Sequence, residues 1–196
     1  MAIIVLDRQH VGKPSHDELG AWGDYDFDGI PDMVEQEAIM TAKYGLAAEI
    51  RLRELGHRVI TMGDGRYEDR HERAKAYKAD VYVAMHVNAG KGDYGLCIYD
   101  SRSAGGKKLA DLVSGDLLKQ CPELSRTVAA WTAPTGSPYP RAWNTIKGVY
   151  DGKPVGLCFE PFFIDRPEHR QLASAEGLAR VGFALAEGIH RFLAGK

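Results

Sequence analysis

Four residues spread along the chain are of types that could hold a metal ion and activate water: His10, Glu37, His86 and Glu160. Three of them follow apolar runs typical of buried strands, at residues 2–7, 81–85 and 155–159. In α/β proteins, sites form where such strands end. Glu37 instead begins a long helical pattern. Two imidazoles and one carboxylate make a zinc site with an open position for water, and a further carboxylate can carry the proton.

Strand and helix patterns alternate along the chain. The predicted order is strand, long loop, helix, strand, helix, strand, loop, strand, helix, irregular segment, strand, helix. We expect helices at residues 36–55, 68–78, 104–119 and 167–193, and a further strand at 57–61. This order predicts an α/β fold in one domain, with a twisted, mostly parallel sheet flanked by helices on both faces. Residues 1–196 contain no repeat or interdomain linker, so we expect no second domain.

Composition excludes several classes of function. The 196 residues are 44% hydrophobic, which is enough for a sizeable core, and the formal net charge is −2. Lysine and arginine are scattered, so we expect no nucleic-acid partner. The three cysteines, Cys97, Cys121 and Cys158, are odd in number and far apart. They indicate no disulfide framework and favour synthesis in a reducing compartment.

Neither end of the chain has a membrane-spanning pattern. The first apolar run is six residues long and stops at Asp7, which is too short for a signal peptide. In the predicted C-terminal helix, a stripe at helical spacing is expected to dock on the core, with membrane insertion as the alternative: Leu178, Val181, Leu185, Ile189 and Phe192. We therefore expect a monomer made in the cytoplasm without obligate membrane association.

Residues 24–35 match the twelve-residue calcium-loop pattern D-x-D-x-D-G-x5-E without a gap. The predicted calcium ligands are the carboxylates of five residues and one main-chain carbonyl: Asp24, Asp26, Asp28, Asp32, Glu35 and Ile30. An acidic, solvated loop is the alternative. Because the loop ends two residues before Glu37, a bound calcium ion could fix the start of the helix that carries this residue.

The sequences around the four site residues resemble motifs of the zinc-dependent N-acetylmuramoyl-L-alanine amidases of the amidase-3 family, found in bacterial autolysins and phage endolysins. Residues 4–12 resemble the family's opening strand, Asp-x-Gly-His-Gly-Gly, and residues 79–89 are similar to Ala-Asp-x-x-x-Ser-x-His-x-Asn-Ala. Residues 157–163 resemble the segment with the catalytic glutamate. The interval between Glu37 and Gly56 fits the family, and Arg73 resembles the arginine of the helix before the third strand.

The resemblance implies a zinc site made of His10, Glu37 and His86, with Glu160 as the catalytic residue. It also implies peptidoglycan as the substrate and cleavage of the amide between N-acetylmuramic acid and L-alanine of the stem peptide. The chain departs from the family at Gln9 and Val11 in place of glycines, at Ala84 in place of serine, and at residues 161–162. Without those glycines, the backbone beside His10 is expected to use ordinary dihedral angles.

Residues 131–143 combine aromatic side chains with prolines and are predicted to form a semi-rigid substrate-binding loop. Trp131 and Trp143 could stack on sugars, and Arg141 could meet a peptide carboxylate. Asn88, in the motif around His86, is a further candidate for substrate binding. The alternative is that the two tryptophans are packing residues.

Two other classes of function stay open. A zinc peptidase acting on the stem peptide could use the same four residues, and a non-enzymatic, calcium-dependent wall-binding protein would need only the calcium loop. If the substrate is peptidoglycan, a protein without a signal peptide must reach the wall by another route. Release of a phage endolysin through a holin pore is the readiest explanation, and a mother-cell autolysin or a chain trimmed of its signal is the alternative.

Overall fold

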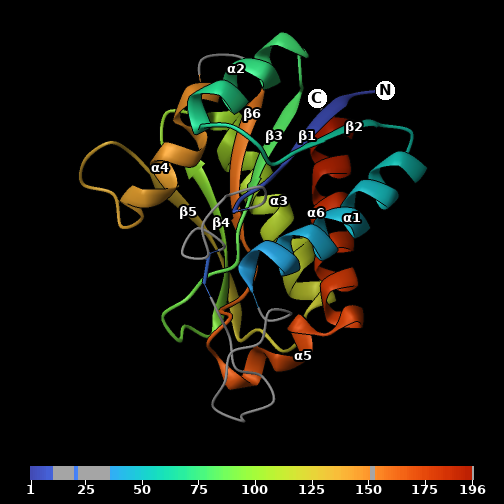
Figure 1. The fold of residues 1–196 in the computed structure, drawn as a ribbon, viewed down its shortest axis with the longest axis vertical. Coiled ribbons are helices and arrows are strands. Elements are labelled where there is room, and N and C mark those ends of the chain that lie inside the picture. The colour runs from blue at the N-terminus through green and yellow to red at the C-terminus, as the bar shows by residue number, and fades with distance from the viewer. Residues whose placement is uncertain (11–19, 22–35, 151–152, 196) are drawn as a thin grey trace.

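The computed structural model describes residues 1–10, 20–21, 36–150 and 153–195. Within them, six strands form one sheet in the order β2-β1-β3-β6-β4-β5 (Figure 1). The strands are β1 (Ile3–Arg8), β2 (Arg58–Met62), β3 (Val81–Met85), β4 (Tyr94–Asp100), β5 (Arg126–Thr132) and β6 (Val155–Glu160).

The strand directions decide which side chains meet. β2, β1, β3 and β6 run parallel to one another, whereas β4 is antiparallel to β6 and parallel to β5. Arg8 pairs with Met85, and Met85 pairs with Phe159, so β1, β3 and β6 end at the same level. β4 begins at that edge, because Leu96 pairs with Glu160. The carboxyl edge of the three central strands therefore gathers residues from four parts of the chain.

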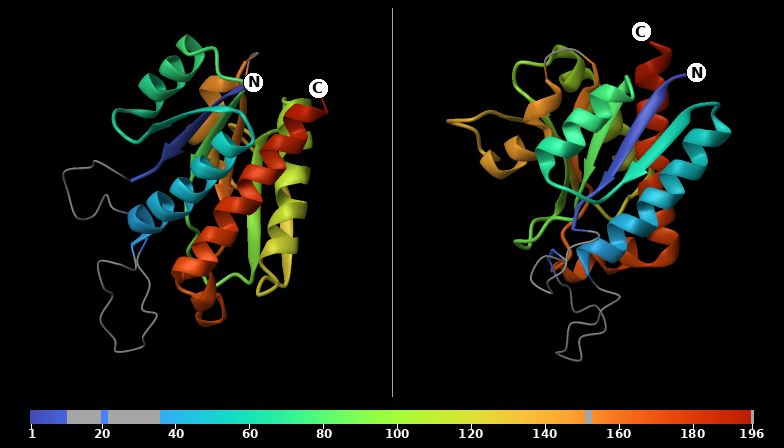
Figure 2. Two further views of the ribbon diagram at one scale, coloured as in Figure 1. Left: turned by 90° about the vertical axis from the view of Figure 1, so that its right-hand side faces the viewer. Right: turned by 45° about the horizontal axis from the view of Figure 1, so that its top comes forward.

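Helices cover both faces of the sheet, as predicted. One face carries α1 (Glu37–Glu54), α3 (Ala104–Gln120) and α6 (Ala175–Ala194), which lie side by side in Figure 2. The other face carries α2 (Tyr67–Ala76) and α4 (Pro140–Ile146). Alternate strand residues supply the two cores: Leu6 packs in the cluster with α1 and α6, and Val5 in the cluster with α2 and α4. The α/β fold class expected from the sequence is confirmed.

The prediction of a single helix at residues 167–193 is wrong. The segment consists of a 3-10 helix, η4 (Pro167–His169), a short α5 (Arg170–Ala173) and α6. Ser174 separates α5 from α6: its backbone is extended, and its hydroxyl accepts a hydrogen bond from Gly177 N at 3.1 Å. This serine caps α6 because its side chain satisfies a free N–H of the first turn. The stripe from Leu178 to Phe192 is buried and docks α6 on the core, as predicted.

The segment predicted to be irregular, between α3 and β6, contains regular structure. It forms β5, α4 and the 3-10 helix η3 (Lys147–Val149). Pro140 occupies the first turn of α4, where the missing N–H costs nothing. Trp131 and Trp143, predicted to share one loop, therefore lie on a strand and on a helix.

Two further expectations concern the described residues. Cys97, Cys121 and Cys158 are free and buried, so none of them forms a disulfide. None of the described helices combines the length and apolar character needed to cross a bilayer.

Candidate metal centre

His10, Glu37 and His86 come together at the carboxyl edge of the sheet. His10 lies two residues beyond the end of β1, His86 follows the last residue of β3, and Glu37 is the first residue of α1. One potential ligand atom from each lies within 4.8 Å of the other two. The rings of His10 and His86 meet edge to face, with centroids 5.4 Å apart. The three residues predicted as metal ligands thus form one cluster.

Three donors orient the carboxylate of Glu37. Its Oε1 accepts from Val87 N at 3.0 Å and lies 3.0 Å from His86 Nδ1, and its Oε2 accepts from Ala21 N at 2.9 Å. His10 Nε2 is 3.6 Å from the same Oε1. Gly20, with φ +87°, lies so close that a side chain there would overlap Glu37. Gly20 and Ala21 belong to no sequence motif or periodic pattern, because only the folded chain brings them to Glu37.

His86 is fixed through its backbone and keeps one nitrogen without a partner. Its N–H donates to Phe159 O at 2.9 Å, and its carbonyl accepts from Tyr44 Oη at 2.8 Å. Its Nε2 is buried and has no hydrogen-bond partner among the described residues. A buried polar atom without a partner is costly, and metal coordination would remove that cost. The donor set of two imidazoles and a carboxylate also suits zinc, so the residues present fit this metal.

Among the ligands of the cluster, the ionisation of Glu37 favours metal binding, whereas a metal ion must compete with a proton for His86. Burial raises the pKa of Glu37, but the hydrogen bond with His86 and the charges of His86 and His10 outweigh burial, so the pKa lies below its ordinary value. Burial lowers the pKa of His86, but the hydrogen bond and charge of Glu37 outweigh it, so the pKa is raised. Glu37 is therefore held as the carboxylate that a metal ligand must be.

A buried polar network supports the end of β1 below His10. Arg70 Nη1 donates to Asp7 Oδ1 at 2.8 Å and to Gln9 Oε1 at 3.1 Å, and Gln9 Nε2 donates to Asp7 Oδ2 at 2.6 Å. The hydroxyl of Tyr82 donates to the same Asp7 oxygen. His10 itself has φ +63°, a left-handed conformation that costs a non-glycine residue about 1–2 kcal/mol. Gln9 keeps an ordinary φ, as predicted, whereas Val11 lies outside the described residues.

The arginine that reaches this network is Arg70. Arg73, chosen from the resemblance, lies at the surface and pairs with Asp64 at 3.0 Å. Both arginines are on α2, but Arg70 is on the inner face, where it is 2% exposed.

Glu160 is the last residue of β6, beside the β3 strand end that carries His86. Burial raises the pKa of Glu160 above its ordinary value; the His86 charge opposes this effect and the Glu37 charge adds to it. Cys158 Sγ lies 3.9 Å from Glu160 Oε1. A buried carboxyl with a raised pKa next to a metal cluster is suited to proton transfer.

Solved structures share this arrangement of strands and helices. Cwp6 from Clostridium difficile matches with a TM-score of 0.77 and 19% identity, over 98% of this chain and 29% of that one. The catalytic domain of CwlV, an N-acetylmuramoyl-L-alanine amidase from Bacillus (Paenibacillus) polymyxa var. colistinus, matches with a TM-score of 0.74 and 17% identity, over 100% of both chains. The chain has the fold of the N-acetylmuramoyl-L-alanine amidases.

The catalytic domain of the CD27L endolysin, which targets Clostridia difficile, shares this amidase fold with a TM-score of 0.64 and 16% identity, over 95% of this chain and 97% of that one. Neither a scan against protein-family models nor a search of the curated proteins gave a match. The present chain spans less than a third of Cwp6 but nearly the full length of the other two structures.

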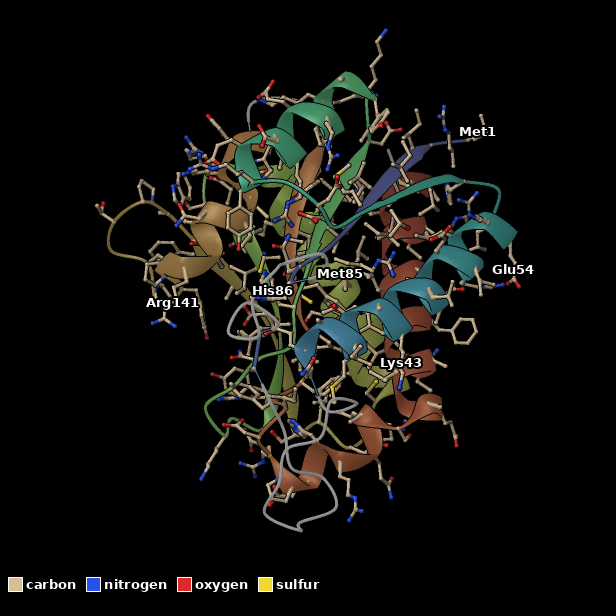
Figure 3. All side chains as sticks on the ribbon, in the orientation of Figure 1. Met1, Lys43, Glu54, Met85, His86 and Arg141 are labelled. Carbon is tan, nitrogen blue, oxygen red and sulfur yellow. The ribbon has the colours of Figure 1, made fainter. Side chains whose placement is uncertain are left out.

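On the amidase fold, a cavity of about 430 Å³ opens beside Glu160. Aromatic side chains from separate elements form part of its wall: Tyr94, Tyr139 and Phe163. Asn88 and Arg141, two of the residues predicted to bind substrate, line it too. Figure 3 shows Arg141 on the α4 side of His86.

The two tryptophans predicted to bind substrate do not line this cavity. Trp143 lies against the Arg102 guanidinium, 4.7 Å from the ring centre, and Trp131 is 40% exposed on the edge strand β5. Trp131 lies on β5 and Trp143 on α4, so the two tryptophans do not belong to one loop.

Two loops at the metal edge are tied together. Asp165 accepts hydrogen bonds from Gly90 N at 2.8 Å and Lys91 N at 3.0 Å, and Phe163 N donates to His169 Nδ1 at 3.0 Å. The two bonds to Asp165 join the loop after His86 to the loop after Glu160, whereas the bond between Phe163 and His169 lies within the second loop.

The predicted calcium ligands lie outside the described residues: Asp24, Asp26, Asp28, Ile30, Asp32 and Glu35. The described part of the chain contains one group of three or more His, Cys, Asp or Glu side chains that could hold a metal, made by His10, Glu37 and His86.

Proposed function

We propose that this chain is a zinc-dependent N-acetylmuramoyl-L-alanine amidase of the amidase-3 family. Its reaction is hydrolysis of the amide between the lactyl group of N-acetylmuramic acid and L-alanine of the stem peptide. The observation that carries the proposal is the cluster of His10, Glu37 and His86, with an unpartnered buried imidazole nitrogen, on the fold of known amidases.

The residues take complementary roles in this reaction. His10, Glu37 and His86 would hold zinc, which when bound lowers the pKa of a water molecule and polarises a carbonyl group. Glu160 accepts the proton of the attacking water and returns it to the leaving amine of L-alanine. Its raised pKa brings the carboxyl closer to the pH at which both transfers are efficient.

The cavity beside Glu160 supplies a surface for the substrate. Tyr94 and Tyr139 offer aromatic faces of the kind that pack on sugar rings, and Arg141 and Asn88 offer polar contacts. We propose that the muramic acid side of the substrate occupies this cavity.

Two variants test the roles of the site. Glu160→Gln is expected to retain zinc and lose turnover by at least about a hundredfold, since the general base is removed. His86→Ala is expected to lose both zinc and turnover. Zinc content is measured by elemental analysis, and the products from defined muropeptides by mass spectrometry. An active Glu160→Gln variant would show that Glu160 is not the general base.

The same products separate the alternatives. Intact stem peptide with a new L-alanine amino terminus supports the amidase, whereas cleavage within the stem identifies a zinc peptidase. The non-enzymatic alternative would bind peptidoglycan and calcium. It would not bind zinc, and it would cleave no muropeptide.

We also propose a structural calcium ion at residues 24–35, because their sequence completes the calcium-loop pattern just before Glu37. A calcium-selective chelator is then expected to lower the melting temperature. An unchanged melt, together with no calcium in the purified protein, would rule this ion out.

For the biological setting, we propose an endolysin that acts on the wall after holin-mediated release. The likeness to the CD27L catalytic domain supports this setting, while the likeness to bacterial amidases keeps a cellular autolysin as the alternative. Co-expression with and without a holin in a susceptible host separates the two, because an endolysin lyses cells only when the holin is present.

A further inference from the structure

A second cavity lies on the other side of the metal ligands from the Glu160 cavity. It has a volume of about 390 Å³ and lies between the end of β1, the exposed side of α1 and the edge strand β2. In the sheet order β2-β1-β3-β6-β4, the ligand-bearing strands β1 and β3 are central. The Glu160 cavity is therefore on the β6 and β4 side, and the second cavity on the β2 side.

The second cavity is lined by the strand and the helix that lead to two of the metal ligands. Arg8 in its wall is two residues before the ligand His10, and Ile39 in its wall is two residues after the ligand Glu37. The Arg8 stem runs beneath α1, where a Cβ added at Gly45 would be 3.7 Å from Arg8 Cδ. The cavity is therefore flanked by the end of β1 and the start of α1, the two elements that lead to His10 and Glu37.

Positive charge exceeds negative charge in the wall of this cavity, which contains Arg8 and Lys43 and one acidic residue, Glu49. Against the effect of burial, the charge of Arg8 is one of the influences that lower the pKa of Glu49, after the hydrogen bonds of Glu49 with Thr61 and Arg53. Arg8 Nε is buried without a hydrogen-bond partner, and neither Arg8 nor Lys43 is in an ion pair within the described ranges. The acidic residue of the wall, Glu49, already accepts from Thr61 Oγ1 at 2.6 Å and from Arg53 Nη2 at 2.8 Å. Arg8 and Lys43 thus line the cavity together with three apolar residues, Ile39, Ala42 and Leu46.

We propose that this cavity binds a carboxylate of the stem peptide, on the residue that follows L-alanine. This inference rests on the proposed amidase function. Arg8 supplies a guanidinium for charge-assisted hydrogen bonds, Lys43 adds a second positive charge, and Ile39 and Leu46 contact the aliphatic part of the residue.

The direction of the substrate follows from the two cavities. The scissile amide sits at the metal, so its sugar side and its peptide side leave in different directions. The aromatic cavity beside Glu160 suits the sugar side, which leaves the cationic cavity for the peptide side. In Figure 3, Arg141 and Lys43 lie on opposite sides of His86, in agreement with this division.

The test compares two muropeptides that differ in one group. One carries a free α-carboxylate on the residue after L-alanine, and the other carries a carboxamide. Zinc-loaded wild type is expected to have a kcat/KM about tenfold higher for the carboxylate, as one charge-assisted contact would give. Arg8→Gln should abolish this preference by raising KM for the carboxylate substrate alone, and Lys43→Gln should reduce it.

Controls separate a lost contact from a damaged protein. Lys119→Gln removes a positive charge from α3, away from both cavities, and should keep the full preference. Arg8→Lys should retain part of the preference, since it restores the charge without the planar guanidinium. Circular dichroism and melting curves confirm that each variant is folded.

Three results would overturn the inference: wild type without a preference, Arg8→Gln with the wild-type preference, or Arg8→Gln impaired equally on both substrates. If Arg141→Gln alone removes the preference, the carboxylate binds in the Glu160 cavity instead. If wild type cleaves neither muropeptide, the proposed amidase function is wrong. Calorimetry with the free stem peptides then tests the cavity itself. The proposed carboxylate site requires that the carboxylate form binds more tightly to wild type than to Arg8→Gln.

Discussion

Replacing Gly20 by alanine is expected to weaken zinc binding more than it weakens the fold. Gly20 has φ +87°, so an alanine there pays about 1–2 kcal/mol for the left-handed backbone. The new methyl group would also press on the Glu37 carboxylate and come within 2.8 Å of Glu37 Cβ. Misplacing the support of a metal ligand typically costs 10–100-fold in affinity, and we expect a loss of about this size.

Gly56 provides a matched control, because it has φ +82° and no atom within 4 Å of an added Cβ. Gly56→Ala should pay the same backbone cost, roughly 2–8 °C in melting temperature for a chain of this size. Its zinc affinity should equal that of wild type. Competition with a chromophoric zinc chelator measures both variants. Equal zinc affinities for Gly20→Ala and Gly56→Ala would refute the view that Gly20 leaves room for Glu37.

Two further predictions concern stability. Arg70→Met leaves the buried Asp7 carboxylate without its ion-pair partner and should lower the free energy of unfolding by about 3–5 kcal/mol in urea titrations. Arg73→Met removes a surface ion pair and should lower it by less than about 1 kcal/mol. Similar losses for both variants would contradict the distinction between the two arginines. Burial lowers the pKa of His71, so its folded-state pKa is below the unfolded value and its contribution to stability is lost as the pH falls below about 6.5. His71→Gln is the control, because glutamine keeps a donor to Thr145 O and does not titrate. Relative to this variant, the free energy of unfolding of wild type should fall by up to about 1.4 kcal/mol between pH 6.5 and 5.5. Parallel plots of unfolding free energy against pH would contradict this assignment.

The position of the metal cluster could be predicted because it depends on strand ends. Apolar runs are visible in a sequence, and in a parallel sheet the residues that follow them must meet at one edge. His10, His86 and Glu160 illustrate this relation. The order of strands and helices, and with it the α/β fold, followed from the same alternation.

Contacts made only by the folded chain could not be predicted. Gly20 and Ala21 have no periodic pattern, yet they border the Glu37 carboxylate. Arg70 and Arg73 have the same chemistry and lie three residues apart, and α2 is too polar for its sequence to show which one faces inward. The left-handed φ of His10 follows Gln9, whose side chain is part of the buried network, and no sequence pattern marks it.

Short elements were also missed for physical reasons. β5 lies at the edge of the sheet and α4 has only seven residues, so neither gives a long periodic signal. The break at Ser174 was hidden because the apolar stripe of α6 continues the pattern of the residues before it.

The reactivity of the three buried cysteines can report on unfolding of the chain. Burial raises the pKa of Cys121 to about 12 and raises the pKa of Cys97 and Cys158 as well, so all three remain protonated and inert while the sheet is closed. Thiolate is a strong ligand for zinc, and a neutral buried thiol does not compete with the histidines for the ion. Cys158 is two residues from Glu160 on β6. The rate at which Cys158 reacts with a thiol reagent therefore reports on the unfolding of this strand. Cys158 is thus a natural probe for unfolding of the strand that ends in Glu160.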